Sequence, residues 1–399
     1  MTSPRIAIIG SGAAGLMAAL AASPAAPCVL LTDGPLGRSN SIMAQGGLQL
    51  PLPEPDSKRR FLEDIVRSAR TDLDMRLVEN FIDHVAETVE LLEEWGLELD
   101  RGEDGQLVRR SAGGLSEPRI VSVRDQIGPA IIKVLRARVQ RCDLEIRQHT
   151  QVLDLARHNG SYRLRLRVEH GSEEELEVRT VVTCTGGITW REAQQRHHPT
   201  TNPHNDNHIL FDRLSALGLT QVHADFFQYQ PFGLVDTAAD LGKCVPESIV
   251  NFGVRILDRS RVPIGDIRQD RYALTHRMFE VAQAGGAVDT EHGPGLWLTL
   301  SDVPAGTLES TFPKVHQYLE RRGGAGQDVL VFPFLHYYLG GLRIDPRCQS
   351  DLPGLFLAGE ITGGLHGRNR LMGNGITDSL VHGRLAGLSA AEYARSVPS

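Results

Sequence analysis

The chain has 399 residues, 41% hydrophobic and 23% charged, which is an ordinary globular composition. Its net charge of −7 argues against a nucleic-acid-binding surface, which normally carries an excess of basic residues. Five scattered cysteines show no metal-ligand spacing, so we expect reduced thiols and a cytoplasmic protein. Glycines interrupt the first apolar segment, and neither a signal peptide nor a membrane span is predicted. We attribute the scarcity of lysine to genomic composition and assign no chemistry to its positions, Lys58, Lys133, Lys243 and Lys314.

The N-terminal segment carries a nucleotide-binding motif. Residues 5–23 predict an apolar strand, a glycine turn and a helix of small residues. Gly10 permits the turn, Gly12 lets the backbone approach a pyrophosphate, and Gly15 lets the helix meet the strand. The helix N-terminus then faces the anion. The segment therefore predicts a dinucleotide-binding site.

Two acids bear on the choice of dinucleotide. Asp33 ends the second predicted strand (27–33), about 20 residues after the motif, where a carboxylate can bind a ribose 2′-hydroxyl. This motif alone does not distinguish FAD from NAD. Glu360 ends a late strand and is placed to contact a ribityl chain, which favours FAD. The alternative for Glu360 is an ordinary solvent-facing acid.

The rest of the chain predicts a mixed fold. We expect helices at 56–95, 128–140 and 376–395, and a late strand at 354–360. Three strand-like runs between turn residues predict a small antiparallel meander; they span 144–158, 161–170 and 173–187.

The polar segment from Trp190 to His208 contains four histidines but no matching acid or cysteine ligands. We interpret it as a mobile loop at the hinge of a second domain, in preference to a metal site, and predict no metal. The histidines are His197, His198, His204 and His208.

Five motifs together resemble one family, in the order that the family has them. They are GRSNSIMAQGG (37–47), VVTCTGG (181–187), ADFFQYQPFG (224–233), FLHYYLGGLRID (334–345) and the segment from LPGLFLAGE to SLVHGR (352–384). They are similar to the flavoprotein subunits of succinate dehydrogenase and fumarate reductase and to L-aspartate oxidase.

The resemblance implies an α/β fold. A Rossmann-like FAD-binding domain, with a parallel sheet and a β-meander, is interrupted by a smaller α+β capping domain. We expect the first part of the FAD domain at 1–225, the cap at 226–334 and the last part at 335–399. The active site is expected between the two domains.

The resemblance also implies an FAD contact set. Respiratory members attach FAD covalently to a histidine, but Asn40 stands at that position, so non-covalent FAD is expected. The expected cofactor-binding residues are Gly10, Gly12, Ala13, Ala14, Gly15, Asp33, Ser39, Asn40, Ser41, Gln45, Gly46, Gly47, Val152, Thr185, Gly186, Glu360, Asn374, Gly375 and Ile376.

On the substrate side, the resemblance makes Arg370 and His336 the ligands of one carboxylate. Arg271 is the expected catalytic arginine, with Arg268 and Arg277 as close competitors. An ordinary surface arginine is the alternative for Arg370, and a satisfied buried histidine for His336. The expected catalytic residues are Arg271, His336 and Arg370, and the expected substrate-binding residues are Gln230, Glu247, His336, His366 and Arg370.

The sequence departs from the family where the second carboxylate is held. Gln230 replaces the family's substrate histidine, Pro246 a threonine and Val250 an arginine. We therefore expect an FAD-dependent oxidoreductase that keeps one carboxylate site and has altered the other.

The expected reaction oxidises or desaturates a small carboxylate-bearing molecule, or reduces one in reverse. Oxygen or a soluble carrier is the expected electron acceptor. A membrane complex with an iron–sulfur partner is disfavoured because the chain ends soon after the last predicted helix. The rival hypothesis is a non-catalytic flavin-binding protein with an eroded site.

Overall fold

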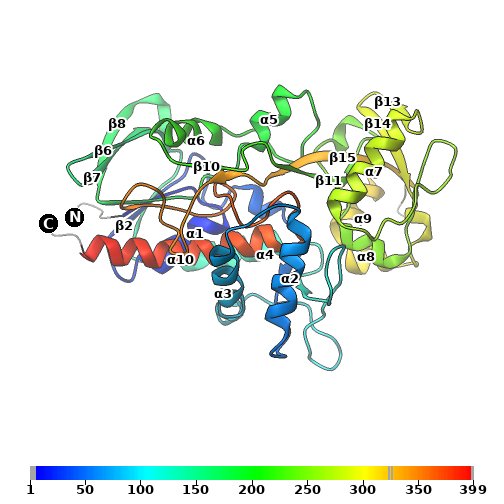
Figure 1. The fold of residues 1–399 in the computed structure, drawn as a ribbon, viewed down its shortest axis with the longest axis horizontal. Coiled ribbons are helices and arrows are strands. Elements are labelled where there is room, and N and C mark those ends of the chain that lie inside the picture. The colour runs from blue at the N-terminus through cyan, green and yellow to red at the C-terminus, as the bar shows by residue number, and fades with distance from the viewer. Residues whose placement is uncertain (1–5, 322–323, 325–326, 397–399) are drawn as a thin grey trace.

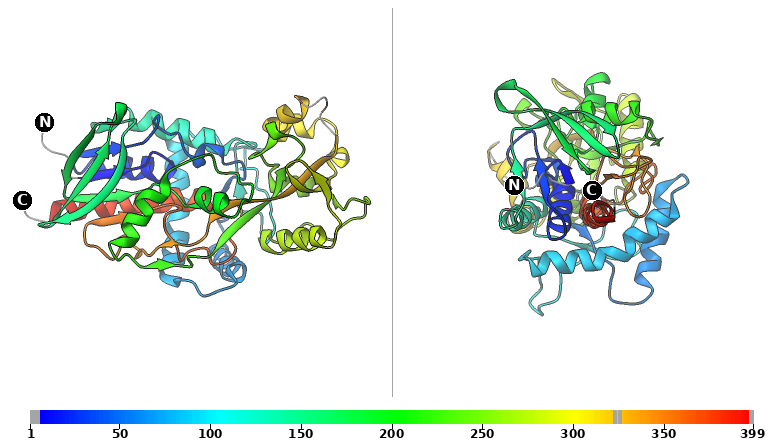
Figure 2. Two further views of the ribbon diagram at one scale, coloured as in Figure 1. Left: turned by 90° about the horizontal axis from the view of Figure 1, so that it is seen from above. Right: turned by 90° about the vertical axis from the view of Figure 1, so that its left-hand side faces the viewer.

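A five-stranded parallel sheet forms the centre of the larger part of the protein. The computed structural model describes residues 6–321, 324 and 327–396, and Figures 1 and 2 show how its elements are arranged. The order β17-β9-β1-β2-β5 corresponds to Leu355–Leu357, Thr180–Thr183, Ile6–Ile9, Cys28–Leu31 and Glu145–Arg147. Together with the antiparallel sheets described below, this confirms the predicted α/β fold class.

Helix α1 (Ala13–Ala22) packs against α10 (Asn374–Ser396), which runs beside it in Figure 1. Their backbones approach closely because α10 presents Gly383 and Gly387 to α1. A Cβ atom at Gly383 would lie 2.5 Å from the Ala14 carbonyl oxygen, and one at Gly387 2.4 Å from that of Ala18. This packing places the middle of α10, at Gly383, against the first turn of α1.

The meander consists of β6, β7 and β8, which pair antiparallel (Gln151–His158, Ser161–Arg167 and Glu173–Val178). The sequence predicted three continuous strands, but the first and third runs are each divided between two sheets. His149 has a positive φ of 52° and separates β5 from β6. Only Arg179 separates β8 from β9, which enters the parallel sheet. Residues of high β-propensity continue without a break at both points, so the sequence did not reveal that the chain passes from one sheet to another there.

The second part is built on an antiparallel sheet of order β11-β15-β14-β12, with β13 added to β14. Figures 1 and 2 show this part beyond one end of the first, with β11 and β15 leading into it. Its strands are Phe227–Leu234, Val329–Tyr338, Gly293–Leu298, Ile256–Leu257 and Val288–Thr290, and its helices are α7 (Arg271–Gln283), α8 (Thr307–Thr311) and α9 (Pro313–Glu320).

Each part has its own hydrophobic core. The cluster of the larger part draws on residues 6–219 and 338–394, and that of the second part on residues 232–331. The domain boundaries at 225 and 334 remain a prediction.

The other helices are α2 (Ser57–Ala69), α3 (Met75–Glu94), α4 (Ile127–Val139), α5 (Thr189–Gln195) and α6 (Asn207–Ala216). Two short strand pairs join β3 (Leu48–Gln49) to β4 (Ile120–Val121) and β10 (Gln221–Val222) to β16 (Gly341–Leu342).

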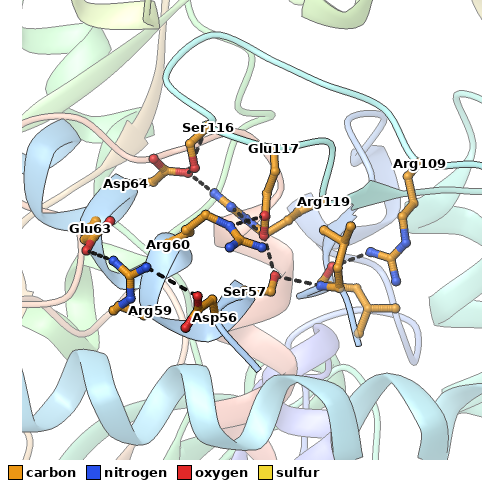
Figure 3. A network of polar contacts seen from close by, with 12 residues as sticks. Asp56, Ser57, Arg59, Arg60, Glu63, Asp64, Arg109, Ser116, Glu117 and Arg119 are labelled. Carbon is orange, nitrogen blue, oxygen red and sulfur yellow. Dashed lines mark hydrogen bonds and ion pairs between the residues drawn. The ribbon is translucent and has the colours of Figure 1, made fainter. Parts of the chain in front are cut away.

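A buried ion network joins α2 to the chain before β4 (Figure 3). Arg119 is fully buried, pairs with Asp64, and lies 3.1 Å from Glu117. The backbone N–H and hydroxyl of Ser116 both donate to Asp64 at 2.8 Å. Arg60 Nε lies 2.5 Å from Glu117. Each buried charge therefore has an opposite charge and additional hydrogen bonds, the condition under which burial is tolerated.

The same arginine supports the C-terminal loop. Arg119 Nε donates to Gln49 Oε1 at 3.4 Å, and Gln49 Nε2 donates to the Met372 carbonyl at 2.8 Å. On the other side of this loop, Ser68 of α2 donates to the Asn369 carbonyl at 3.1 Å. The segment between Asn369 and Met372 is thus held from two directions.

Removing the charge of Arg119 should therefore destabilise the protein strongly. Arg119→Met leaves Asp64 buried with only the exposed Arg67 as a charged partner, and we expect the free energy of unfolding to fall by about 3 kcal/mol. Arg59→Met is the matched control, because Arg59 pairs with Glu63 on the exposed face of α2 and such exposed pairs contribute little to stability. Urea unfolding of both variants measures the difference; equal losses would contradict the assigned role.

Candidate active site

One large cavity brings the predicted site residues together. Its volume is about 690 Å³, and its lining comes from the motif before α1, the loop around η1 (Asn40–Met43), the meander, the second part and the C-terminal loop. Among the predicted site residues that line it are Gly10, Gly12, Asp33, Asn40, Val152, Gln230, Glu247, Arg271, His336, Glu360 and Arg370.

One end of the cavity has the geometry of a dinucleotide cradle. Gly10 has a φ of +101°, and a Cβ there would lie 2.4 Å from the Cys184 carbonyl oxygen, so only glycine fits. The backbone N–H of Ala13, in the first turn of α1, donates to the Ser41 hydroxyl at 3.2 Å. A helix N-terminus with small residues before it suits an anionic pyrophosphate. These residues therefore fit FAD.

Asn40 meets the polar loop that follows α5. Its side-chain amide donates to the amide oxygen of Asn202, whose own nitrogen donates to the His336 carbonyl at 2.8 Å. Thr201, in the same loop, lies with its hydroxyl 2.7 Å from His336 Nδ1. The loop therefore connects the segment around Asn40 to His336, a role that the histidines of the loop did not suggest.

Glu360 lines the cavity and is not a solvent-facing acid at a strand end. One carboxylate oxygen accepts from the Tyr338 backbone N–H at 2.9 Å and from the Thr189 hydroxyl at 3.1 Å. Burial raises the pKa of Glu360 to about 7, although these hydrogen bonds and the charge of Arg370 oppose the rise. The geometry suits a group that accepts hydrogen bonds from hydroxyls.

Arg370 is a buried cation with few partners. It is 6% exposed, and its Nε has no hydrogen-bond partner in the part of the chain that the structure describes. Its guanidinium carbon lies 4.4 Å from the centre of the Tyr337 ring, a cation–π contact. Burial and repulsion from Arg271 lower the pKa of Arg370 to about 10, which still leaves it charged at neutral pH.

Arg271 begins α7 and faces the same cavity. Its Nε donates to Glu247 Oε1 at 2.5 Å, and one terminal nitrogen donates to Gln228 Oε1 at 2.7 Å. The two competing arginines lie elsewhere: Arg268 is exposed, and the exposed Arg277 donates to the Ile264 carbonyl. Of the three candidates, only Arg271 lines the cavity.

His336 lies near the end of β15, and the positive charges of both cavity arginines act on its imidazole. Burial and the positive charges of Arg271 and Arg370 lower the pKa of His336 well below its ordinary value. The imidazole is therefore neutral at neutral pH. The contact of Nδ1 with Thr201 leaves Nε2 as the ring nitrogen that can serve a ligand.

Three predicted site residues do not line the cavity. His366 is 5% exposed, lies 3.5 Å from Asp378, and packs edge-on against Tyr337, so the prediction that it binds substrate is not supported by its position. Gly15 serves helix packing, because a Cβ there would lie 1.9 Å from the Gly10 carbonyl oxygen. Asn374 is buried at the start of α10.

Sequence reasoning missed several residues that border the site. Gln228 shares a strand with Gln230 two positions on, and this spacing could have marked both as facing one side. Tyr337 adjoins His336 and contacts Arg370, which no sequence pattern indicated. Lys243 and Lys314 also line the cavity, although the sequence alone assigned no chemistry to their positions.

Two features are absent from the residues that the structure describes. Among them, no group of three or more histidine, cysteine or acidic side chains is arranged to hold a metal ion. Within the same residues, no helix combines the length and the apolar character that crossing a membrane requires. All five cysteines are free thiols.

Comparison with known proteins gives consistent matches across the chain. A family model described as "FAD binding domain" matches residues 5–376. A fumarate reductase (CoM/CoB) chain from Methanothermobacter marburgensis is 29% identical over 411 residues, which cover 98% of this chain and 73% of that protein. The L-aspartate oxidase of Xylella fastidiosa is 30% identical over 391 residues, with coverage of 95% and 73%.

Solved structures show the same fold. A variant of the quinol fumarate reductase FrdA from E. coli superposes with a TM-score of 0.91 at 24% identity, covering 100% of this chain and 71% of that one. Mycobacterium smegmatis Sdh1 in complex with UQ1 gives 0.83 at 26% identity, covering 100% and 70%.

The chain therefore belongs to the FAD-binding family that includes fumarate reductase flavoprotein subunits and L-aspartate oxidases, and it is an FAD-dependent oxidoreductase. The predicted family, fold class and FAD cofactor are thereby confirmed. The roles of individual site residues remain predictions.

The raised pKa of Glu360 predicts a specific dependence of stability on pH. Between the ordinary glutamate value of 4.5 and about 7, the folded protein keeps a proton that the unfolded chain has lost. Stability should therefore fall as pH rises through this interval. Glu360→Gln keeps an acceptor oxygen without the ionisation. From pH 5 to 8, wild type should lose up to about 3 kcal/mol relative to this variant.

Urea unfolding of flavin-free protein across this pH range measures the effect. Glu309→Gln, at an exposed position, is the control and should keep the wild-type profile. Parallel profiles for wild type and Glu360→Gln would show that Glu360 does not titrate in this interval.

Proposed function

We propose that this oxidoreductase acts on a small molecule with a carboxylate beside the reacting bond. Its direction is either oxidation or desaturation, or the reverse reduction of an activated double bond. In the oxidative direction oxygen or a soluble carrier accepts the electrons, and in the reductive direction a reduced soluble carrier supplies them. Bound FAD, held without a covalent bond because Asn40 is not a nucleophile, supplies the two-electron chemistry.

The observation that carries this proposal is the buried guanidinium of Arg370. A buried cation without a carboxylate partner is costly, and a planar guanidinium matches a carboxylate with two parallel hydrogen bonds. Its Nε lacks a partner among the described residues, and its pKa of about 10 leaves it charged at neutral pH. An anionic ligand neutralises the charge of Arg370 and accepts a hydrogen bond from its Nε, and these contacts orient the ligand.

His336 supports the same carboxylate as a neutral donor. When the Thr201 hydroxyl donates to Nδ1 at 2.7 Å, the proton resides on Nε2, which can donate to a substrate oxygen. Two donors of this kind withdraw charge from the carboxylate. That withdrawal eases C–H cleavage at the adjacent carbon, or stabilises the charge that develops there.

Arg271 is the candidate for moving a proton at the neighbouring carbon. A guanidinium holds its proton tightly in water, so such a role needs a special environment. Glu247 and Gln228 provide fixed partners at 2.5 and 2.7 Å, and Arg370 adds a repelling positive charge. This arrangement supports Arg271, rather than Arg268 or Arg277, in the catalytic role.

The far end of the substrate differs from that of a simple four-carbon diacid. Gln230 and Pro246 line the cavity where the resemblance would have placed a histidine and a threonine. Neither side chain carries a positive charge, so the second carboxylate site of the relatives is not reproduced at these positions.

Replacing Arg370 should abolish the reaction while leaving FAD bound. We expect Arg370→Met to slow flavin reduction by a substrate acid at least a hundredfold, the scale on which a donor to developing charge contributes. Arg277→Met, on the exposed face of α7, is the control and should retain the wild-type rate. Anaerobic stopped-flow absorbance of the flavin measures both.

Candidate acids for this assay include succinate, aspartate and longer diacids, with chemically reduced flavin used for the reverse direction. No response to any acid in either direction would favour a non-catalytic flavin-binding protein. An unchanged rate in Arg370→Met would remove Arg370 from the site.

A further inference from the structure

The end of the cavity formed by the second part is positively charged. Lysine is rare in this chain, with four residues in all, yet Lys243 and Lys314 both line the cavity. The other two, Lys58 and Lys133, do not line it. The enrichment of lysine at this end therefore calls for a chemical explanation.

The two lysines come together through one face of α9. Lys314 and Tyr318 are four residues apart and therefore share a side of the helix. The ammonium nitrogen of Lys243 lies 4.9 Å from the centre of the Tyr318 ring. Tyr318 and Cys244 also line the cavity. The same region of the cavity is thus lined by two cations and an aromatic ring, which come from two separate segments of the second part.

Lys314 has capacity for a ligand. In the part of the chain that the structure describes, its ammonium makes no hydrogen bond or ion pair. The nearby acid Asp125 accepts instead from the backbone N–H of Lys314 at 2.9 Å. The charge of Lys314 nevertheless reaches the cavity wall, since it lowers the pKa of Cys244, which burial raises.

The lysine end is separate from the arginine end. The charges that act on His336 are those of Arg271 and Arg370, whereas those acting on Cys244 are Lys314, Glu247 and Arg271. Arg271 acts on both groups and pairs with Glu247 at 2.5 Å, whereas Lys314 acts only on Cys244 and Arg370 only on His336. Gln230 borders the same stretch, and its amide oxygen has no partner among the described residues.

We propose that Lys314, assisted by Lys243, binds a second anionic group of the substrate, a carboxylate or a phosphate. This group lies further from the reacting bond than the second carboxylate of a four-carbon diacid does. The unpartnered oxygen of Gln230 accepts a hydrogen bond from a hydroxyl or amine between the two ends. The inference rests on the proposed function, because Arg370 must hold the first carboxylate.

Binding of a graded series of acids to the FAD-loaded protein tests the proposal without requiring turnover. The probes are α,ω-dicarboxylates of four to eight carbons, ω-phosphonocarboxylates of the same lengths and the matching monocarboxylates. Perturbation of the flavin absorbance gives each Kd. We expect wild type to prefer one of the longer dianions over succinate.

Lys314→Gln should weaken binding of that dianion about tenfold to hundredfold, as loss of a charge-assisted hydrogen bond does. It should leave the monocarboxylates unchanged. Lys58→Gln, which removes an exposed lysine paired with Asp83 on the surface, is the matched control and should change none of these values. A larger effect on the phosphonates than on the diacids supports a phosphate at the far end, and the reverse supports a carboxylate.

The outcomes separate this inference from the proposed function. If Lys314→Gln binds every acid as wild type does, or weakens mono- and dianions equally, the lysine site is refuted. Arg370→Met still abolishes binding in that case, and the proposed function stands. If wild type binds no acid of the series and Arg370→Met changes nothing, both are refuted.

Discussion

The arrangement of the active site depends on one glutamine that spans two parts of the molecule. Gln228 Oε1 accepts from Arg271 of the cap helix, while its Nε2 donates to the Arg370 carbonyl at 2.9 Å and to Asn369 Oδ1 at 3.1 Å. The four residues involved are all buried, and this amide satisfies its three partners with a single orientation. A neutral side chain therefore fixes the position of Arg271 relative to the Arg370 segment, and this arrangement supports the proposed anion site.

This geometry has an electrostatic consequence. Two guanidinium groups face one cavity, and the proximity of Arg271 lowers the pKa of Arg370. Glu247 compensates Arg271 at 2.5 Å, whereas within the described residues the guanidinium of Arg370 contacts the Tyr337 ring and the Leu371 carbonyl without a carboxylate in salt-bridge range. The network of Arg119, Asp64 and Glu117 holds the loop from below, so Arg370 cannot relax into solvent to reduce the repulsion. This positive charge is what the proposed carboxylate ligand would compensate.

Much of this could be predicted from local sequence, and the rest could not for identifiable reasons. The glycine spacing at Gly10 and Gly12 specifies a turn that only one geometry satisfies, so the nucleotide end was predictable. Thr201 and Gln228 were missed because their roles arise from long-range pairing, with His336 135 residues away and with Arg271 43 residues away. His366 was expected at the substrate because it shares a motif with Arg370, but its side chain lies 3.5 Å from Asp378 and does not line the cavity. The low lysine content led us to assign no chemistry to the lysines, because the rarity of a residue type does not reveal where the fold places its few members.

The two long strands that enter the cap have a further implication. β11 and β15 pair with register shifts between Gln228 and Tyr229 and between Gln230 and Gly233, beside the residues that border the cavity. Irregular pairing bends and twists a ribbon more easily than a regular ladder does. His336 lies on β15 in the same stretch, and Lys243 and Lys314 are carried by the part beyond it. A flexion of this ribbon would change the distance of Lys243 and Lys314 from Arg370 and, with it, the ligand length that the proposed lysine site accepts.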